Sequence, residues 1–324
     1  MQEKNYICKI CSNTNGNKAF FPKEMMFGTR EEFEYFECGN CGCLQIYAIP
    51  TDMAPYYPDN YYSFGNIQYV HKPWKIFLKK KLIQYKIFKQ KTWIGRLMAV
   101  KYSDPEDFYP WLEKIKPAFN ASILDVGCGS GNLLLKLRKS GFVNVYGIDP
   151  FIKQDIVYAG GVRIYKKPIT DLSALHDMII FNHSLEHMEN QQELLSKVFS
   201  LLKPGGCALI RIPVTSTYAW RTYGINWVQL DAPRHFYLHT VRSMDILRKK
   251  AGFSDMEVNF DSNDLQFWGS EQYVQGIPLR DPRSYAEHYD DVLFSKEQMR
   301  AFREKAELLN GQNDGDMACF YLRK

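Results

Sequence analysis

The glycine-rich stretch Ile123-Leu-Asp-Val-Gly-Cys-Gly-Ser-Gly-Asn-Leu-Leu constrains the fold of this 324-residue chain more than any other feature. An apolar run ends at Asp125, glycines then follow at alternate positions, and leucines at helical spacing come next. Glycine adopts backbone conformations that other residues avoid, and the free N–H groups at a helix start can bind an anion. The order Asp-x-Gly-x-Gly-x-Gly differs from the Gly-x-Gly-x-x-Gly fingerprint of dinucleotide sites. The stretch therefore predicts a strand, a ligand-binding turn and a helix.

Strands and helices alternate through the rest of the chain. Apolar runs predict strands at 122–126, 143–148, 163–165, 178–182, 207–212, 255–260 and 317–322. Three- and four-residue periodicity predicts helices at 132–140, 191–202, 240–251 and 295–310. Apolar strands separated by helices are typical of a parallel sheet that is covered on both faces. We therefore expect an α/β fold, a Rossmann-like, seven-stranded and mostly parallel sheet with helices on both faces.

The residues before this region divide into two segments of different composition. Residues 1–50 hold five of the eight cysteines, and residues 51–116 combine a Tyr-rich loop with a basic helical stretch at 73–102. Nine lysines and one arginine lie between positions 71 and 101 without an acid, a local charge of +10 in a chain of net charge +5. We expect a cysteine-rich unit at 1–50, a connector at 51–116 and the α/β domain at 117–324.

The basic stretch and the overall hydropathy bear on location. No run approaches the eighteen apolar residues that a membrane-spanning helix needs, and the first residues lack the apolar core of a secretion signal. We expect a cytoplasmic protein without a transmembrane segment. Residues 72–91 have two interpretations: a lysine face exposed to solvent, or a peripheral contact with an anionic membrane surface or a diphosphate-bearing substrate.

Four cysteines are spaced as metal ligands. The pairs Cys8-x-x-Cys11 and Cys38-x-x-Cys41 are separated by 26 residues, and each such turn directs two thiolates toward one point. In a cytosolic chain this clustering favours metal over disulfides. We expect one structural zinc ion held by Cys8, Cys11, Cys38 and Cys41, with Cys43 as an alternative to Cys41. A redox dithiol is the competing interpretation.

The motifs together resemble the class I S-adenosylmethionine-dependent methyltransferases. The resemblance rests on Asp125-Val-Gly-Cys-Gly-Ser-Gly, Asp149, His183-Ser-Leu-Glu-His187 and Leu202-Lys-Pro-Gly-Gly206, which stand in the family's order. It implies S-adenosylmethionine as cofactor, with the glycine loop at the methionyl part and Asp149 at the ribose. The implied cofactor-binding residues are Asp125, Gly127, Cys128, Gly129, Gly131, Asp149, Ile169 and Asn182. Ile169 is included for its backbone, because Lys167-Pro-Ile-Thr170 stands where the family often has an acid near the adenine.

A narrower resemblance concerns the acceptor. The four-cysteine segment, the Tyr-rich loop and Trp227-Val-Gln-Leu-Asp-Ala-Pro-Arg-His235 are similar to sugar methyltransferases of deoxysugar and surface-polysaccharide pathways. This implies methyl transfer to a hydroxyl or carbon of a nucleotide-linked or glycan sugar. The loop tyrosines could line such a sugar pocket: Tyr56, Tyr57, Tyr61 and Tyr62.

A hydroxyl acceptor must lose its proton, and histidine titrates near neutrality. His183, Glu186 and His187 follow the fourth predicted strand of the α/β domain, at the edge where open α/β sites lie. We favour His187 as the base with Glu186 as its orienting partner, and His235 as the rival from a later loop. His183 is a further candidate at helical spacing from both neighbours. We expect His176 and His239 at the surface.

Three other functions compete with this reading. An RNA methyltransferase would use the cysteine-rich unit and the basic stretch. The basic residues are confined to one segment, so we do not expect a nucleic-acid partner. A quinone or lipid-intermediate methyltransferase would dock through the amphipathic helix. A non-catalytic zinc-bearing binding protein would not need the intact glycine loop and Asp149.

Overall fold

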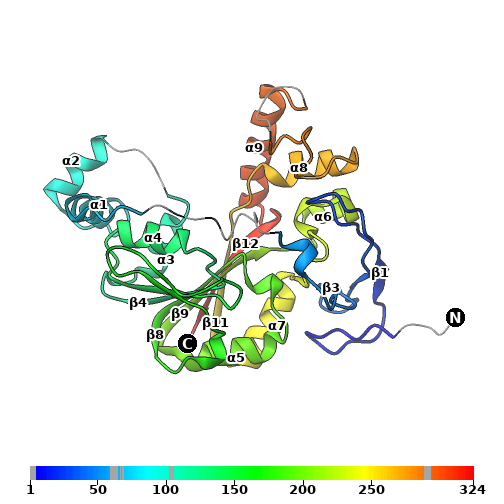
Figure 1. The fold of residues 1–324 in the computed structure, drawn as a ribbon, viewed down its shortest axis with the longest axis horizontal. Helices are drawn as coiled ribbons and strands as arrows, with labels where there is room; N and C mark the ends of the chain where they lie inside the picture. Colours follow the sequence, from blue (N-terminus) through cyan, green and yellow to red (C-terminus); the bar gives the residue numbers. More distant parts are fainter. Residues whose placement is uncertain (1–4, 59–64, 66, 68, 102–105, 288–292) are drawn as a thin grey trace. The chain divides into compact units, whose positions relative to one another are not determined.

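The computed structural model describes residues 5–58, 65, 67, 69–101, 106–287 and 293–324 (Figure 1). The chain forms two compact units, each assembled from separate stretches of sequence. Unit 1 comprises Met1–Pro58, His183–Ser196 and Ile210–Leu322, and unit 2 comprises Asp59–Asn182, Lys197–Leu209 and Arg323–Lys324. This division differs from the three consecutive segments expected from the sequence.

The larger sheet has eight strands in the order β11-β12-β9-β8-β4-β5-β7-β6. Their bounds are β4 Ser122–Val126, β5 Asn144–Ile148, β6 Ile156–Val157, β7 Arg163–Tyr165, β8 His176–Asn182, β9 Leu202–Pro213, β11 Asp255–Phe260 and β12 Met317–Arg323. Parallel pairs join β4 to β5, β4 to β8 and β5 to β7, whereas β6 is antiparallel to β7. The expected α/β fold is confirmed. The strand count was one too low, because the two residues of β6 are too few to show a period.

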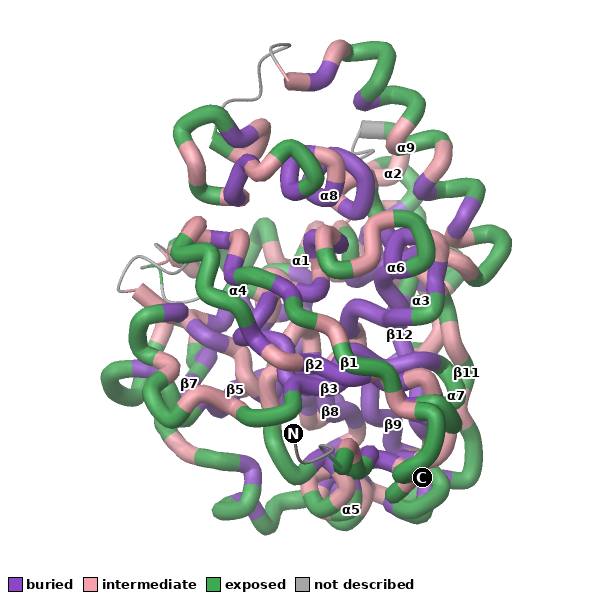
Figure 2. Tube along the Cα trace, turned by 90° about the vertical axis from the view of Figure 1, so that its right-hand side faces the viewer, coloured by how far each residue is buried: buried purple, intermediate pink, exposed green. Residues whose placement is uncertain are grey.

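The register brings three strand ends to one edge of the sheet in unit 2. Asp125 of β4 lies opposite Gly147 of β5 and Ile180 of β8, so the carboxyl ends of these parallel strands coincide. Most residues of β8 are buried, and Figure 2 draws buried residues in purple. Burial on both faces accounts for the apolar runs by which the strands were predicted.

Nine α-helices and several short 3-10 turns lie in the described part of the chain. The helices are α1 Pro73–Lys86, α2 Trp93–Lys101, α3 Tyr109–Ile115, α4 Asn132–Lys139, α5 Gln191–Leu201, α6 Tyr218–Tyr223, α7 Val241–Ala251, α8 Leu265–Val274 and α9 Lys296–Gly311. Capping boxes begin α7 and α9, which explains their well-defined starts. The helical stretch expected at 73–102 consists of two helices, α1 and α2, with Lys89 at a positive φ of 56° between them.

The smaller sheet joins the cysteine-rich segment to a distant part of the chain within unit 1. Its order is β1-β2-β3-β10, with bounds Lys18–Phe20, Tyr35–Glu37, Leu44–Ile46 and Tyr237–Leu238. All three pairs are antiparallel, and Tyr237 lies opposite Gln45. Residues 1–50 therefore share a sheet with residues near 237.

None of the helices in the described ranges combines the length and the apolar composition needed to span a membrane.

Candidate functional site

The glycine loop joins β4 to α4 in unit 2. Gly127, Gly129 and Gly131 all have positive φ, at 71°, 51° and 82°. A Cβ on Gly131 would lie 2.4 Å from Cδ1 of the buried Ile164. The conformation of all three positions therefore favours glycine, and at Gly131 the available space requires it as well.

Asp149 holds this loop in place from the end of β5. Its Oδ2 accepts the Gly129 N–H at 2.8 Å, and its Oδ1 accepts the Phe151 N–H at 2.9 Å. An ionised carboxylate can accept about four hydrogen bonds, so acceptor capacity remains for a ligand. Asp149 thus fixes the loop and keeps lone pairs that can accept further hydrogen bonds.

Two buried carboxyl groups lie at this edge, and a positively charged ligand would stabilise their ionised forms. Burial, with a further contribution from the negative charge of Asp149, raises the pKa of Asp125 to about 8. Burial also raises the pKa of Asp149, against the backbone hydrogen bonds from Phe151 and Gly129. At the end of β8, the buried Oδ1 of Asn182 has no hydrogen-bond partner among the described residues. S-adenosylmethionine, with two ribose hydroxyls, an ammonium and a sulfonium, matches this donor-poor set.

Two other predicted cofactor residues serve packing in the structure. The Sγ of Cys128 lies against Gly147, where an added Cβ would be only 2.3 Å from it. Ile169 is buried in a 3-10 turn, Ile169–Asp171, and its carbonyl accepts the Leu172 N–H at 3.1 Å. A backbone contact between Ile169 and the adenine stays a prediction.

His183 begins the segment that follows β8, and it is tied to an arginine. Its N–H donates to the Arg211 carbonyl at 2.9 Å, and its Nε2 accepts a hydrogen bond from the Arg211 guanidinium. Its Nδ1 lies 3.6 Å from Oε1 of Glu186. Because Arg211 occupies the Nε2 lone pair, His183 is poorly placed to take a proton from an acceptor.

The structure brings Glu186, His187 and His235 together within unit 1. The ring centroids of the two histidines are 4.7 Å apart, and Nε2 of His235 lies 4.0 Å from Oε1 of Glu186. Burial acts to raise the pKa of Glu186, but the contact with His183 and the charges of the neighbouring histidines outweigh it and lower the pKa to about 2. Burial, with the charge of His235, lowers the pKa of His187, so that His187 is neutral near pH 7. A neutral imidazole is the form that can accept a proton.

A buried arginine supports this cluster. Arg234 is 0% exposed and bonds Asp231 at 2.6 Å and Glu24 at 2.9 Å. Its carbonyl accepts the Nδ1–H of His187 at 2.8 Å. Sequence reasoning missed both acids. Asp231 carried a signal, its i, i+3 spacing to Arg234, whereas Glu24 is 210 positions away and carried none.

Two histidines expected at the surface are buried, so that prediction was wrong. His176 bonds Tyr146 and Ser122, and burial lowers its pKa to about 4. His239 bonds Gln191 at 2.6 Å, and burial lowers its pKa to about 3. Their polar neighbours come from distant segments, which local sequence patterns do not reveal.

The tyrosines of the predicted sugar pocket are only partly described. Tyr56 is buried and bonds Glu31, while the Oη of Tyr57 lies 3.3 Å from Nδ1 of His187. Tyr61 and Tyr62 lie outside the described residues. Tyr57 is therefore the tyrosine that the structure places beside the histidine cluster.

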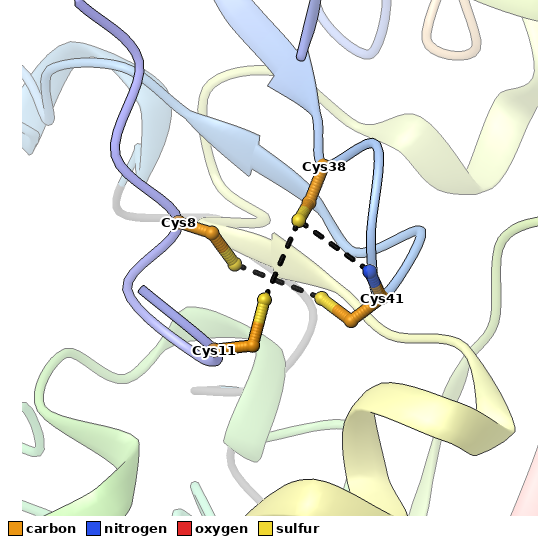
Figure 3. Close-up of side chains that lie close together, drawn as sticks. All are labelled: Cys8, Cys11, Cys38 and Cys41. Atoms are coloured by element: carbon orange, nitrogen blue, oxygen red, sulfur yellow. Dashed lines mark hydrogen bonds between the residues drawn. The ribbon is translucent and has the colours of Figure 1, made fainter. Parts of the chain in front are cut away.

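The four predicted zinc ligands converge within unit 1 (Figure 3). The Sγ atoms of Cys8 and Cys41 are 3.6 Å apart, those of Cys11 and Cys38 are 3.5 Å apart, and all four lie within 4.8 Å of one another. Tetrahedral zinc with bonds of about 2.3 Å holds sulfurs about 3.8 Å apart, so the set fits zinc. Cys43 is outside the group, with its Sγ 3.9 Å from Nδ1 of His239.

Comparisons with known proteins agree with this geometry. Residues 103–258 match the family described as Methyltransferase domain. A ubiquinone biosynthesis O-methyltransferase of Rickettsia canadensis is 36% identical over 112 residues, which cover 31% of this chain and 47% of that protein. One of Rickettsia conorii is 37% identical over 97 residues, 27% of this chain and 33% of that protein. The chain thus spans about half the length, or less, of the curated relatives it matches.

Solved structures include proteins of related fold. A SAM-dependent methyltransferase from Mesorhizobium loti is 18% identical, with a TM-score of 0.44, covering 68% of this chain and 99% of that one. One from Archaeoglobus fulgidus is also 18% identical, with a TM-score of 0.39, covering 68% of this chain and 100% of that one. At these scores neither likeness bears on acceptor or mechanism. Residues 103–258 are thus similar to a methyltransferase domain, and the glycine loop between β4 and α4 lies within the matched residues.

Proposed function

We propose that the chain transfers a methyl group from S-adenosylmethionine to a hydroxyl of a nucleotide-linked or glycan sugar, with a sugar carbon as the less favoured acceptor atom. The observation that supports methyl transfer is the donor-poor edge formed by Asp125, Asp149 and Asn182 around the glycine loop. The hydroxyl is favoured because a histidine–carboxylate cluster follows directly in the chain after Asn182. The sugar is favoured by the resemblance of the four-cysteine segment and the Trp227–His235 stretch.

When bound, S-adenosylmethionine supplies a methyl carbon whose bond to sulfur breaks, with the electron pair staying on sulfur, as the acceptor oxygen bonds to carbon. The glycine loop and Asp149 hold the donor in position, which matters because an in-line displacement depends on alignment. The acceptor hydroxyl gives its proton to the cluster, where His187 is our leading base and His235 its rival. Glu186 orients these rings and stabilises the positive charge that the proton brings.

An acceptor screen with methyl-labelled cofactor tests the reaction, and two variants test the base. His187→Ala and His235→Ala should be compared for turnover once an acceptor is found. We expect the substitution that removes the base to lower kcat by about a hundredfold to ten-thousandfold, while cofactor affinity stays nearly unchanged. His71→Ala is the control, because His71 belongs to unit 2 and the cluster belongs to unit 1. Near wild-type turnover in both cluster variants would mean that positioning alone drives the reaction.

We propose that the four-cysteine group holds one structural zinc ion. Nitrogen donors already face the sulfurs, as expected around thiolates: the Gln45 amide reaches Cys8 Sγ at 3.0 Å, and the Cys41 N–H reaches Cys38 Sγ at 3.4 Å. The intact set of four thiols leaves no open position for a substrate, which favours a structural role.

A second candidate acceptor is a quinone or another lipid-borne hydroxyl, and one surface of unit 2 favours it. Trp93, Leu97 and Val100 are 78%, 65% and 87% exposed and lie at i, i+4 and i+7 on α2. Gly95 holds α2 against α1, since a Cβ there would lie 2.4 Å from the Lys81 carbonyl oxygen. The curated relatives reported above are named as O-methyltransferases of ubiquinone biosynthesis, and the lysines of residues 72–91 complement an anionic membrane.

A vesicle experiment tests this apolar face. The protein should sediment with vesicles containing anionic lipid, and binding should weaken as salt rises, because lysine–headgroup attraction is screened. The double variant Trp93→Ser/Leu97→Ser should lower partitioning at least tenfold, since burying one large apolar side chain contributes about 1.5–3 kcal/mol. Phe151→Ser, which removes a 79% exposed aromatic elsewhere in unit 2, is the matched control. Absent or salt-independent binding would contradict membrane docking and would mean that the lysine face is exposed to solvent.

A further inference from the structure

The carboxylate of Glu186 is buried without a hydrogen bond. Its side chain is 0% exposed, and neither carboxylate oxygen has a hydrogen-bond partner among the described residues. An ionised carboxylate normally accepts several hydrogen bonds, and burying one without them is strongly unfavourable. Both Glu186 oxygens are therefore able to accept a further binding partner.

The nearest basic groups are too far away or already bound. Nδ1 of His183 is 3.6 Å from Oε1 of Glu186, and Nε2 of His235 is 4.0 Å from it, both beyond hydrogen-bond distance. The guanidinium of Arg234 is bound to Asp231 and Glu24 instead. The Glu186 carboxylate and one ring nitrogen of each facing histidine nevertheless lie within 4.8 Å of one another.

Both facing histidines are held through Nδ1 by a backbone carbonyl. Nδ1 of His187 lies 2.8 Å from the Arg234 carbonyl oxygen, and Nδ1 of His235 lies 2.7 Å from the Gln229 carbonyl oxygen. A carbonyl only accepts, so Nδ1 of each ring carries a proton, and Nε2 is the nitrogen left for a ligand. A histidine whose Nδ1–H is held by a carbonyl is the usual arrangement of a metal ligand.

Backbone contacts hold the three groups in register. The Phe236 N–H donates to the Glu186 carbonyl at 2.8 Å, which ties the 185–187 turn to the loop that carries His235. Tyr35 Oη donates to the His235 carbonyl at 2.9 Å. These two hydrogen bonds fix the backbone that carries the candidate ligands, which favours a fixed binding geometry.

From this geometry we infer that Glu186, His187 and His235 bind a divalent transition-metal ion. One ligand atom from each residue lies within 4.8 Å of the other two. Metal–ligand distances of about 2.0–2.2 Å hold such atoms about 3–4 Å apart, so small side-chain rotations complete the site. Two imidazoles and one carboxylate suit zinc, iron, cobalt or nickel, and three protein ligands leave positions open for an acceptor oxygen.

This site deepens the proposed function, because a metal ion here would favour the deprotonated acceptor hydroxyl in place of a histidine base. Its test does not depend on methyl transfer. If no metal binds while an acceptor is methylated, the proposed function stands with a histidine as the base. If metal binds and no acceptor is found, the site stands without the proposed reaction.

Metal content of the full chain decides the question. Protein saturated with Co²⁺ or Zn²⁺ and passed through gel filtration should hold two ions per chain, one at the four thiols and one here. Glu186→Gln and His187→Gln should each hold one, with at least a hundredfold loss of affinity for the second ion. The Co²⁺ form should add weak visible bands of nitrogen and oxygen ligands to the intense thiolate absorption.

His71→Gln is the matched control and should keep both ions. One ion per chain in the wild type, with thiolate absorption only, would overturn the inference without reference to any variant. Two ions retained by both cluster variants, each folded by circular dichroism, would overturn it equally. Two variants are used because Glu186 is fully buried and His187 is partly exposed, so that a folding defect in one leaves the other informative.

Discussion

Replacing Cys8 with serine should remove one zinc equivalent per chain and unfold the smaller sheet of unit 1. Apparent binding free energies of structural zinc are about 10–16 kcal/mol, comparable to the whole stability of a domain at about 5–15 kcal/mol. The three strands β1, β2 and β3 have three residues each, too few to hold a sheet without the metal. Metal analysis and thermal melting of the reduced protein measure both effects.

Unfolding of the smaller sheet in Cys8→Ser should disturb the histidine cluster but not the glycine loop. Residues 44 and 45 of β3 pair with β10, and Tyr35 of β2 bonds the His235 carbonyl, so the smaller sheet positions His235. The loop and Asp149 belong to unit 2 and have their own core. We therefore expect Cys8→Ser to abolish turnover while cofactor affinity stays within a few-fold of wild type.

Cys43→Ser is the matched control for this prediction. Cys43 is as buried as Cys8 and lies in the same segment, but its Sγ contacts His239 and Leu44 rather than the thiol group. It should keep the full zinc content and lose only modest stability. Zinc content equal to wild type in Cys8→Ser, or lost in Cys43→Ser, would contradict the assignment of ligands.

Local patterns were sufficient for the larger sheet. Strands such as β4 and β8 are buried on both faces, so each appears in the sequence as an apolar run. Asp125 lies at the end of β4, and Asp149 directly follows β5. The glycine spacing was equally predictive, because positive φ and close packing at Gly131 leave no choice of residue. These features depend on neighbours within a few positions.

Features made by distant segments could not be predicted. Strand β10 has two residues and is recognisable only through its pairing with β3, almost two hundred positions earlier. The bond from Arg234 to Glu24 spans 210 positions, and nothing near Glu24 indicates it. The burial of His239 likewise depends on Gln191. The proximity of His235 to Glu186 and His187, and the carboxylate of Glu186 without a hydrogen bond, became visible only in three dimensions.

Replacing Asp149 with alanine should weaken S-adenosylmethionine binding by one to two orders of magnitude. Charge-assisted hydrogen bonds to the ribose hydroxyls contribute about 1.5–3 kcal/mol, which corresponds to that factor. The substitution also removes the acceptor of the Gly129 N–H and so loosens the loop itself. Calorimetry measures the affinity. Asp155→Ala is the control, since Asp155 also accepts a backbone N–H, from Lys166 at 2.7 Å, but is exposed.

A pH readout separates this role from a general loss of structure. The pKa of Asp125 is raised to about 8 when folded, above its ordinary value of about 3.9, partly by the charge of Asp149. The folded state therefore binds this proton more tightly, and the free energy of unfolding falls as pH rises from about 4 to 8. Removing Asp149 lowers the folded pKa of Asp125, so the fall should be smaller in Asp149→Ala than in wild type. Unchanged cofactor affinity together with an unchanged pH slope would show that Asp149 neither binds the ribose nor acts on Asp125.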